Sequence, residues 1–218
     1  MSTTNQPAIS VLMTVFNTPF ELVRRAIDSV LTQDYQSFEL LVIDDGSEAE
    51  LGEQVTGYCQ IHQSKIRYVK HQNCGQSQSI NRGVQISIGT YIAIIDSDDE
   101  YRPNHLSACL DEMRYADLIS SFTETIVTCE ADHFVPDRFD HKKSIHVDDC
   151  TLFATLFGKR EVFETLRFKT MYSADSEFYI RASLDYLAKK VNLKTYVYYR
   201  NSSHSITAKL KENQVIFS

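Results

Sequence analysis

Several features that define particular protein classes are missing from this chain of 218 residues. No apolar run approaches the ~20 residues of a membrane-spanning helix, and the polar segment 1–8 lacks the basic and apolar blocks of a secretory signal. Positive charge is not in excess, because the net charge is −7, so non-specific binding to nucleic acid or to an anionic membrane is not expected. We therefore expect a cytoplasmic protein with no membrane span. Peripheral attachment at the inner face of the membrane would have to come from a partner or from further parts of a longer chain.

Cysteine and glycine are also distributed in a way that excludes common classes. The five cysteines are odd in number and none belongs to a CxxC pair. This pattern argues against a disulfide framework and against a zinc site, and it indicates reduced thiols. No G-x-G-x-x-G follows the first apolar run and there is no Walker A sequence, which argues against a dinucleotide-dependent oxidoreductase and a P-loop kinase.

The first half of the chain alternates between strand and helix patterns. Apolar runs predict strands over 9–15, 38–43, 66–69 and 91–95, and apolar periodicity predicts helices over 19–31 and 76–85. We expect Thr18 to cap the first helix, with Pro19 at its first position. This alternation predicts an α/β protein with a mixed, mostly parallel sheet and right-handed crossovers.

The second half is less regular. Its patterns predict a helix that opens at Pro103, two strand-like stretches within 118–129, helices over 162–166 and 175–187, and a closing strand over 191–199. The polar segment 134–149 is the best candidate for a mobile loop.

The segment Asp96-Ser97-Asp98-Asp99 directly follows an apolar strand. Three carboxylates within four residues repel one another, and a divalent cation would relieve that repulsion. Hard cations such as Mg²⁺ and Mn²⁺ take oxygen ligands, commonly carboxylates together with substrate phosphates. The plain alternative is a solvated acidic turn in front of the helix that opens at Pro103.

A second acidic pair, Asp44-Asp45, ends another strand and runs into Gly46-Ser47. Ligands of such sheets bind beyond the carboxyl ends of the strands, so both acidic segments should lie on one rim. The Asp44-Asp45 pair can be a simple turn, since Asp-Gly is common turn chemistry. A carboxylate there can also accept a hydrogen bond from a nucleotide base, for example from the N3–H of uracil.

An ordered set of motifs resembles family-two glycosyltransferases over roughly the first hundred residues. The matching segments are Val11–Asn17, Ser29–Gln33, Glu39–Ser47, Asn73–Gly75, Asn81–Gly83 and Gly89–Ile92 leading into Asp96–Asp99. The resemblance implies the GT-A fold, in which a Rossmann-like nucleotide-binding half is fused to an acceptor-binding half. We expect residues 1–100 to form the first half and residues 101–218 the second, as parts of one domain.

The resemblance also implies roles for individual residues. The nucleotide-sugar would be contacted by Thr14, Phe16, Asn17, Asp44, Asp45, Asn81, Arg82, Asp96 and Asp98. A metal ion, Mn²⁺ or Mg²⁺, would be held by Asp98, Asp99 and His204; for His204 the alternatives are a phosphate contact and a plain surface position. Ile80 departs from the family, where many relatives carry Arg. Two alternatives follow: Arg82 compensates, or the donor phosphate relies more on the metal.

The second half carries fainter matches. Leu156–Glu164 resembles a segment that lines the acceptor side, and Tyr199-Arg200 with 204–207 resembles a signature near the diphosphate. Ala174-Asp175 resembles the Glu-Asp motif whose Asp is the catalytic base, with Ala174 in place of the usual Glu. Four aromatic residues could form a sugar-stacking platform, although core packing is their commoner role: Tyr35, Tyr101, Tyr172 and Phe178.

The resemblance thus implies a metal-dependent, inverting glycosyltransferase of the hexosyltransferase type. Its donor would be a nucleotide-sugar, with a UDP-sugar expected. Its acceptor would be a hydroxyl of a carbohydrate, a lipid-linked molecule or another compound, in surface polysaccharide or glycan assembly. Two alternatives stay open: a non-catalytic nucleotide- or carbohydrate-binding module with the GT-A fold, and a sugar nucleotidyltransferase. The sugar, the acceptor and the oligomeric state do not follow from the sequence.

Overall fold

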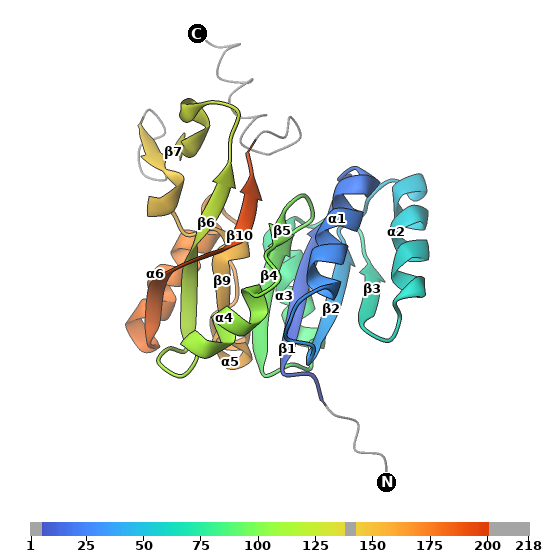
Figure 1. The fold of residues 1–218 in the computed structure, drawn as a ribbon, viewed down its shortest axis with the longest axis horizontal. Helices are drawn as coiled ribbons and strands as arrows, with labels where there is room; N and C mark the ends of the chain where they lie inside the picture. The colour runs from blue at the N-terminus through green and yellow to red at the C-terminus, as the bar shows by residue number, and fades with distance from the viewer. Residues whose placement is uncertain (1–5, 138–142, 201–218) are drawn as a thin grey trace.

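The computed structural model describes residues 6–137 and 143–200, and a single eight-stranded sheet forms its centre (Figure 1). The strands lie in the order β3-β2-β1-β4-β9-β6-β10-β5. Their bounds are β1 Ile9–Val15, β2 Phe38–Asp44, β3 Ile66–Lys70, β4 Tyr91–Asp96, β5 Glu100–Tyr101, β6 Leu118–Ile126, β9 Leu156–Lys159 and β10 Ala188–Tyr199. A separate antiparallel pair is formed by β7 (Phe134–Pro136) and β8 (Ser144–His146).

The sheet is mixed and mostly parallel. β1 pairs in parallel with β2 and β4, and β2 pairs in parallel with β3. β9 is antiparallel to both β4 and β6, so β6 and its parallel neighbour β10 run in the same direction as β1 to β4. The carboxyl ends of these parallel strands therefore meet along one edge of the sheet, toward the top of Figure 1.

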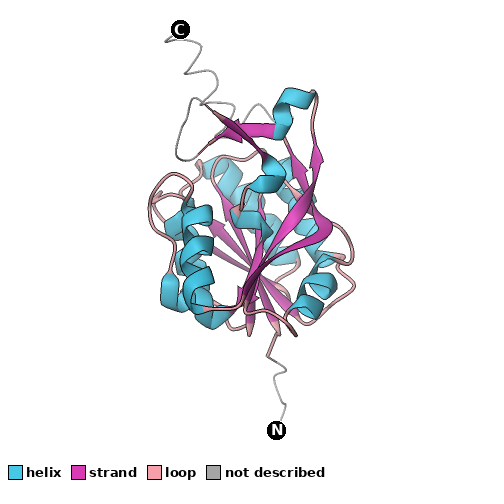
Figure 2. Ribbon diagram, turned by 90° about the vertical axis from the view of Figure 1, so that its left-hand side faces the viewer, coloured by secondary structure: helices cyan, strands magenta, loops and turns pink. Residues whose placement is uncertain are grey.

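Helices cover both faces of the sheet (Figure 2). One face packs against α1 (Phe20–Leu31), α2 (Ala49–Ile61) and α4 (His105–Glu112), and the other against α3 (Gln76–Ile86), α5 (Arg160–Leu166) and α6 (Ala174–Asp185). A strand covered on both faces buries nearly all of its side chains, which is why β1 and β2 are mostly apolar and do not alternate between apolar and polar residues.

The predicted elements of the first half are present, with two differences. The first helix begins at Phe20 and has no side-chain cap, because the Thr18 hydroxyl lies 2.7 Å from the Ser97 hydroxyl and joins two loops instead. The helix α2 was not predicted, although its buried Val55 and Cys59 have helical spacing and carried a usable signal.

The second half differs more from its prediction. β6 is one strand of nine residues where two strand-like stretches were expected, and β10 starts three residues earlier than predicted. The part of the polar segment 134–149 that the structure describes contains β7 and β8. No helix within residues 6–137 and 143–200 combines the length and the apolar character needed to cross a membrane.

Candidate active site

The sheet register brings the two acidic segments together. β1 lies between β2 and β4, with Val15 opposite Asp44 and Thr14 opposite both Ile43 and Asp96. The half-buried Thr14 therefore sits between the strand ends that carry the two acidic segments. The prediction that both segments share one rim follows directly from this parallel pairing.

The loop after β1 is tied to the loop after β2. The Asn17 N–H donates to the Ser47 hydroxyl at 3.1 Å, and the Asn17 side-chain oxygen accepts from the Glu48 N–H at 2.9 Å. Asn17 has a left-handed backbone (φ 52°), a conformation that asparagine tolerates better than most residues. The preceding Phe16 is left 52% exposed at this edge, so its ring can meet a flat ligand.

The buried Asp44 carboxylate is hydrogen-bonded within the protein. Its carboxylate accepts hydrogen bonds from the Ser47 N–H at 2.7 Å and from the Tyr68 hydroxyl, and Lys70 lies 3.5 Å away. Burial works to raise the pKa of Asp44, but these hydrogen bonds and the Lys70 charge outweigh it and leave the pKa below its ordinary value. The buried Asp44 thus holds the turn after β2 and keeps its negative charge.

Asp45 points to the loop after β3. Its two oxygens accept the N–H groups of Cys74 and Gly75 at 2.8 and 2.9 Å, and one of them lies 3.4 Å from His71 Nδ1. Gly46 makes this close approach possible, because a Cβ there would lie 2.7 Å from the Asn73 nitrogen and its φ is +87°. The buried Asp45 therefore fixes the loop in front of α3 next to the end of β2.

The segment Asp96–Asp99 forms a tight turn, with the Asp99 N–H donating to the Asp96 carbonyl at 3.2 Å. Burial and the neighbouring Asp98 charge raise the pKa of Asp96 to about 7, although a hydrogen bond from Gln76 at 2.7 Å opposes the change. Burial, with the charges of Asp96 and Asp98, also raises the pKa of Asp99 well above its ordinary value. The mutual repulsion predicted from the sequence is therefore present.

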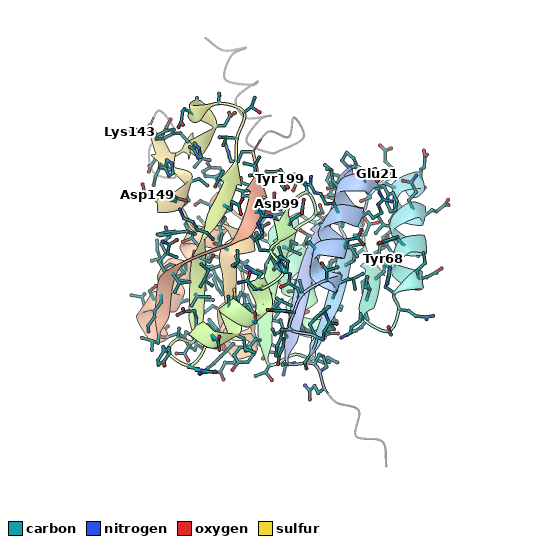
Figure 3. The ribbon with its side chains drawn as sticks, viewed as in Figure 1. Glu21, Tyr68, Asp99, Lys143, Asp149 and Tyr199 are labelled. Atoms are coloured by element: carbon teal, nitrogen blue, oxygen red, sulfur yellow. The ribbon has the colours of Figure 1, made fainter. Side chains whose placement is uncertain are left out.

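The carboxylates differ in how much of each is already used. Asp99 is buried, and its two oxygens accept hydrogen bonds from the Tyr196 hydroxyl at 2.7 Å and the Tyr199 N–H at 2.8 Å. Figure 3 shows Asp99 beside Tyr199, at the junction of the acidic turn with β10. Asp98 is less buried than Asp99. An oxygen-only set whose members raise one another's pKa fits a hard divalent cation.

Asp175 reaches the same edge from the second half of the chain. It lies in the first turn of α6, after Ser173 with a left-handed backbone (φ 56°), and accepts the Ser176 N–H at 2.7 Å. The charge of Asp175 contributes to the raised pKa of Asp96, so the two carboxylates lie within electrostatic reach.

Tyr172, 48% exposed, donates from its hydroxyl to the Pro136 carbonyl at 3.3 Å. Tyr101 and Phe178, by contrast, are core residues.

Two of the residues predicted for ligand contact, Asn81 and Arg82, lie on α3. The Asn81 amide is buried and makes two 2.8 Å hydrogen bonds with the backbone of Phe168, so it joins α3 to the segment between α5 and α6. Arg82 is exposed on α3. His204 lies outside the residues that the structure describes.

Three further residues shape this edge and were not predicted. Gln76 bonds Asp96 from the start of α3, Tyr196 bonds Asp99, and Arg25 on α1 donates to the Asp98 carbonyl at 2.5 Å and lies over the Tyr199 ring. Gln76 directly follows the Asn73–Gly75 motif, which could have directed attention to it. Nothing in local spacing points to Tyr196 or Arg25, because their partners are distant in the sequence.

The geometry can now be compared with known proteins. The model of the family described as "Glycosyl transferase family 2" matches residues 10–185, most of the chain. The chain belongs to glycosyl transferase family 2. The family resemblance stated from the sequence motifs is thereby confirmed.

Relatives of this family member come from bacteria and archaea. An uncharacterised glycosyltransferase of Methanocaldococcus jannaschii is 26% identical over 188 residues, covering 81% of this chain and 65% of that protein. A protein of Escherichia coli, whose name provisionally assigns it to colanic acid biosynthesis as a glycosyl transferase, is 38% identical over 109 residues, covering 49% and 38%. The chain thus spans less than two thirds of the length of these curated relatives.

Solved structures confirm the GT-A fold. A mannosyltransferase of Pyrobaculum calidifontis in complex with GDP-Man and Mn²⁺ superposes with a TM-score of 0.70 at 17% identity, over 88% of this chain and 56% of that one. Residues 1–349 of S. aureus TarS in complex with UDP-GlcNAc superpose with a TM-score of 0.69 at 18% identity, over 92% and 60%.

Proposed function

We propose that this family member is an inverting, metal-dependent glycosyltransferase that moves a hexose from a nucleotide-sugar, expected to be a UDP-sugar, to a hydroxyl acceptor. The observation that carries the proposal is the position of Asp175. A carboxylate from α6 lies within electrostatic reach of Asp96 at the edge where β1, β2 and β4 end. This proximity supports a role for Asp175 as a base beside the donor site.

The donor half of the site would divide its tasks among the strand-end residues. Thr14 and Asp45 would contact the nucleoside, with Phe16 and Asn17 at its border and Asp44 supporting the loop. Asp96 would support the acidic turn, while Asp98 and Asp99 would hold Mn²⁺ or Mg²⁺. A cation bound there would supply Lewis acidity toward the oxygens of the departing diphosphate. The neighbours' complexes with GDP-Man and Mn²⁺ and with UDP-GlcNAc support this class of donor.

Asp175 would act on the acceptor. Its carboxylate takes the proton from the acceptor hydroxyl, whose oxygen forms a bond to the anomeric carbon as the bond from that carbon to the diphosphate oxygen breaks. Attack and departure on opposite faces of the sugar invert the anomeric configuration, as in inverting glycosidases. A role in polysaccharide or other glycan assembly is supported by the name of the Escherichia coli relative. The exposed Tyr172 ring near this position is a candidate for stacking on the acceptor sugar.

Thermal unfolding with nucleoside diphosphates tests the donor site. UDP, GDP, CDP and dTDP are each added with Mn²⁺ or with a chelator. A ligand at about 100 times its dissociation constant stabilises by roughly 2.7 kcal/mol, which at this chain length raises the midpoint by about 5–10 °C. We expect such a rise with UDP and Mn²⁺, and its loss with chelator or in Asp98→Asn. A larger rise with GDP would leave the proposal of a transferase intact and overturn the assignment of uracil as the base. No rise with any of the four would contradict the donor site.

Replacing Asp175 separates an enzyme from a binding module with the same fold. We expect Asp175→Asn to lower turnover of the donor by about 10²- to 10⁴-fold, the usual contribution of a general base, while the rise in midpoint with UDP and Mn²⁺ is unchanged. Asp185→Asn, at the far end of α6, is the matched control and should retain full turnover. Full turnover in Asp175→Asn would remove this residue from the mechanism. Absence of turnover in the unmodified protein, with nucleotide binding intact, would favour the non-catalytic alternative.

A further inference from the structure

A second group of metal-ligating side chains lies at the end of β2, apart from the acidic turn. Asp45, His71 and Cys74 place one ligand atom each within 4.8 Å of one another. The Asp45 oxygen lies 3.4 Å from His71 Nδ1, and the Cys74 sulfur lies 3.7 Å from the same nitrogen. Asp45 is buried and the other two are half-buried.

Two of the three ligand separations approach those of a tetrahedral zinc site, and the third, between Asp45 and Cys74, lies within 4.8 Å. Zinc binds nitrogen and carboxylate oxygen at about 2.0–2.2 Å and sulfur at about 2.3 Å. Two ligands that span a tetrahedral angle are then separated by roughly 3.3–3.6 Å. The two contacts of His71 Nδ1 fall on or just above this range, so little movement is needed for an ion to sit among the three atoms.

The surroundings orient the ligands. The other ring nitrogen, His71 Nε2, lies 3.2 Å from the Ser79 hydroxyl, which leaves Nδ1 as the atom that faces Asp45 and Cys74. Histidines that bind metals commonly donate their second ring N–H to such a partner. Asp45 is held by the N–H groups of Cys74 and Gly75. In the absence of an ion, Nδ1 has the Gln72 carbonyl at 2.8 Å as an alternative partner, which metal binding would have to replace.

We propose that the Asp45–His71–Cys74 cluster is a binding site for a soft divalent cation, Zn²⁺ foremost, with water completing the tetrahedron. A thiolate and an imidazole select zinc over Mg²⁺ and Mn²⁺, which prefer the oxygen-only acidic turn. The absence of a CxxC pair argued against a zinc site in the sequence, but this site needs one cysteine only. Its other ligands come from the end of β2 and the loop after β3.

The site has a consequence for donor binding that rests on the proposed function. Asp45 cannot bind zinc and accept a hydrogen bond from a nucleotide base with the same oxygen in the same pose. Zinc bound to the cluster would therefore compete with the nucleotide-sugar, and free zinc would inhibit the transferase without touching the Mn²⁺ or Mg²⁺ site.

Titration of the whole chain with Co²⁺ tests the site, because cobalt bound to a thiolate gives a charge-transfer absorption band that oxygen ligands do not give. The unmodified protein, Cys74→Ser and Cys129→Ser are compared, and Zn²⁺ is then added to displace the cobalt. Cys129 is the matched control, since its exposed thiol also lies near a carboxylate, that of Asp132. Thermal unfolding of each variant shows that it is folded.

We expect one equivalent of thiolate-bound Co²⁺ in the unmodified protein and in Cys129→Ser, displaced by Zn²⁺ but not by excess Mg²⁺, and no band in Cys74→Ser. No band in the unmodified protein, or a band that survives in Cys74→Ser, overturns the proposal. Addition of UDP with Mg²⁺ should then reduce the band. A band that forms as expected but resists UDP would keep the zinc site and overturn the placement of the nucleotide at Asp45.

Discussion

At the scale of single residues, the neighbouring Asp98 and Asp99 have different surroundings. Asp99 is buried between the Tyr196 hydroxyl and the Tyr199 N–H, whereas Asp98 is less buried. The charge pattern in the sequence treats the two alike. The difference arises because β10 passes beside the acidic turn, where Tyr196 and Tyr199 donate hydrogen bonds to the Asp99 carboxylate.

Substitutions at these two positions should differ in their effect on stability. Asp99→Ala leaves a buried N–H and hydroxyl without their acceptor, so we expect the free energy of unfolding to fall by about 2–6 kcal/mol, at about 1–3 kcal/mol for each unsatisfied group. Asp99→Asn keeps the shape of the side chain and one acceptor oxygen, so it should lower the free energy of unfolding by less. Asp98→Asn should cost less stability than Asp99→Ala, because Asp98 is less buried, and it should weaken Mn²⁺ binding. Denaturant unfolding and metal titration measure the two effects; equal destabilisation by Asp98→Asn and Asp99→Ala would contradict the distinction.

At the scale of elements, Asn81 joins α3 to the segment between α5 and α6. Both atoms of its buried amide bond the backbone of Phe168, whose ring stacks on Phe178 of α6 with centroids 4.2 Å apart. The family resemblance implies a donor contact for Asn81. The two hydrogen bonds favour a structural role for Asn81, because they use both the NH₂ group and the oxygen of its buried amide. Arg181 of α6 adds to the same junction by donating to the carbonyls of Leu166 and Arg167.

Asn81→Ala should therefore act on stability more than on donor binding. The substitution leaves the buried N–H and carbonyl of Phe168 without hydrogen-bond partners. We expect a loss of about 2–4 kcal/mol in the free energy of unfolding. The rise in midpoint with UDP and Mn²⁺ should persist. Gln85→Ala, at an exposed position of the same helix, is the control and should change stability by less than about 0.5 kcal/mol. If Asn81→Ala keeps its stability and loses the response to UDP, the donor contact is the correct role.

At the scale of the whole molecule, one buried histidine couples stability to pH. His105 of α4 is 3% exposed, lies 2.8 Å from the Thr195 hydroxyl of β10 and stacks on Tyr101 of β5. Burial lowers the pKa of His105 to about 3. The unfolded chain binds a proton at this residue near pH 6.5 and the folded chain does not, so its stabilising effect is full above pH 6.5 and declines as the pH falls toward 3.

We expect the free energy of unfolding to fall by about 2 kcal/mol between pH 7 and pH 5 through His105 alone, since 1.5 units below an unfolded pKa of about 6.5 corresponds to about 2 kcal/mol. At this chain length that contribution corresponds to about 4–8 °C in the unfolding midpoint. It is read as the difference between the two proteins, because the raised pKa of Asp96 acts in the opposite direction over the same pH range. In His105→Asn, whose amide can still meet Thr195, this part of the pH dependence should disappear. Calorimetry from pH 7 to pH 5 on both proteins measures it. The same slope in both would show that other groups are responsible.

Local patterns in the sequence were sufficient for the strand–helix alternation and the rim that carries both acidic segments. Apolar runs longer than a turn can only be buried strands or helices, and parallel strands bring their carboxyl ends to one edge. Local patterns did not predict the helix α2, and they predicted a cap at Thr18 that the structure does not have. A weakly amphipathic helix and a hydroxyl that bonds a distant loop depend on their neighbours.

The sequence by itself determined the family, the fold class and the two acidic segments, because these depend on residue order and on short-range periodicity. Only the tertiary structure decided that Asp175 lies near Asp96, that Asp99 and Asn81 are engaged by backbone groups, and that Asp45, His71 and Cys74 form one cluster. Each of these depends on contacts between segments far apart in the chain. Such contacts are set by how the sheet, its crossovers and its covering helices pack, and no local spacing encodes them.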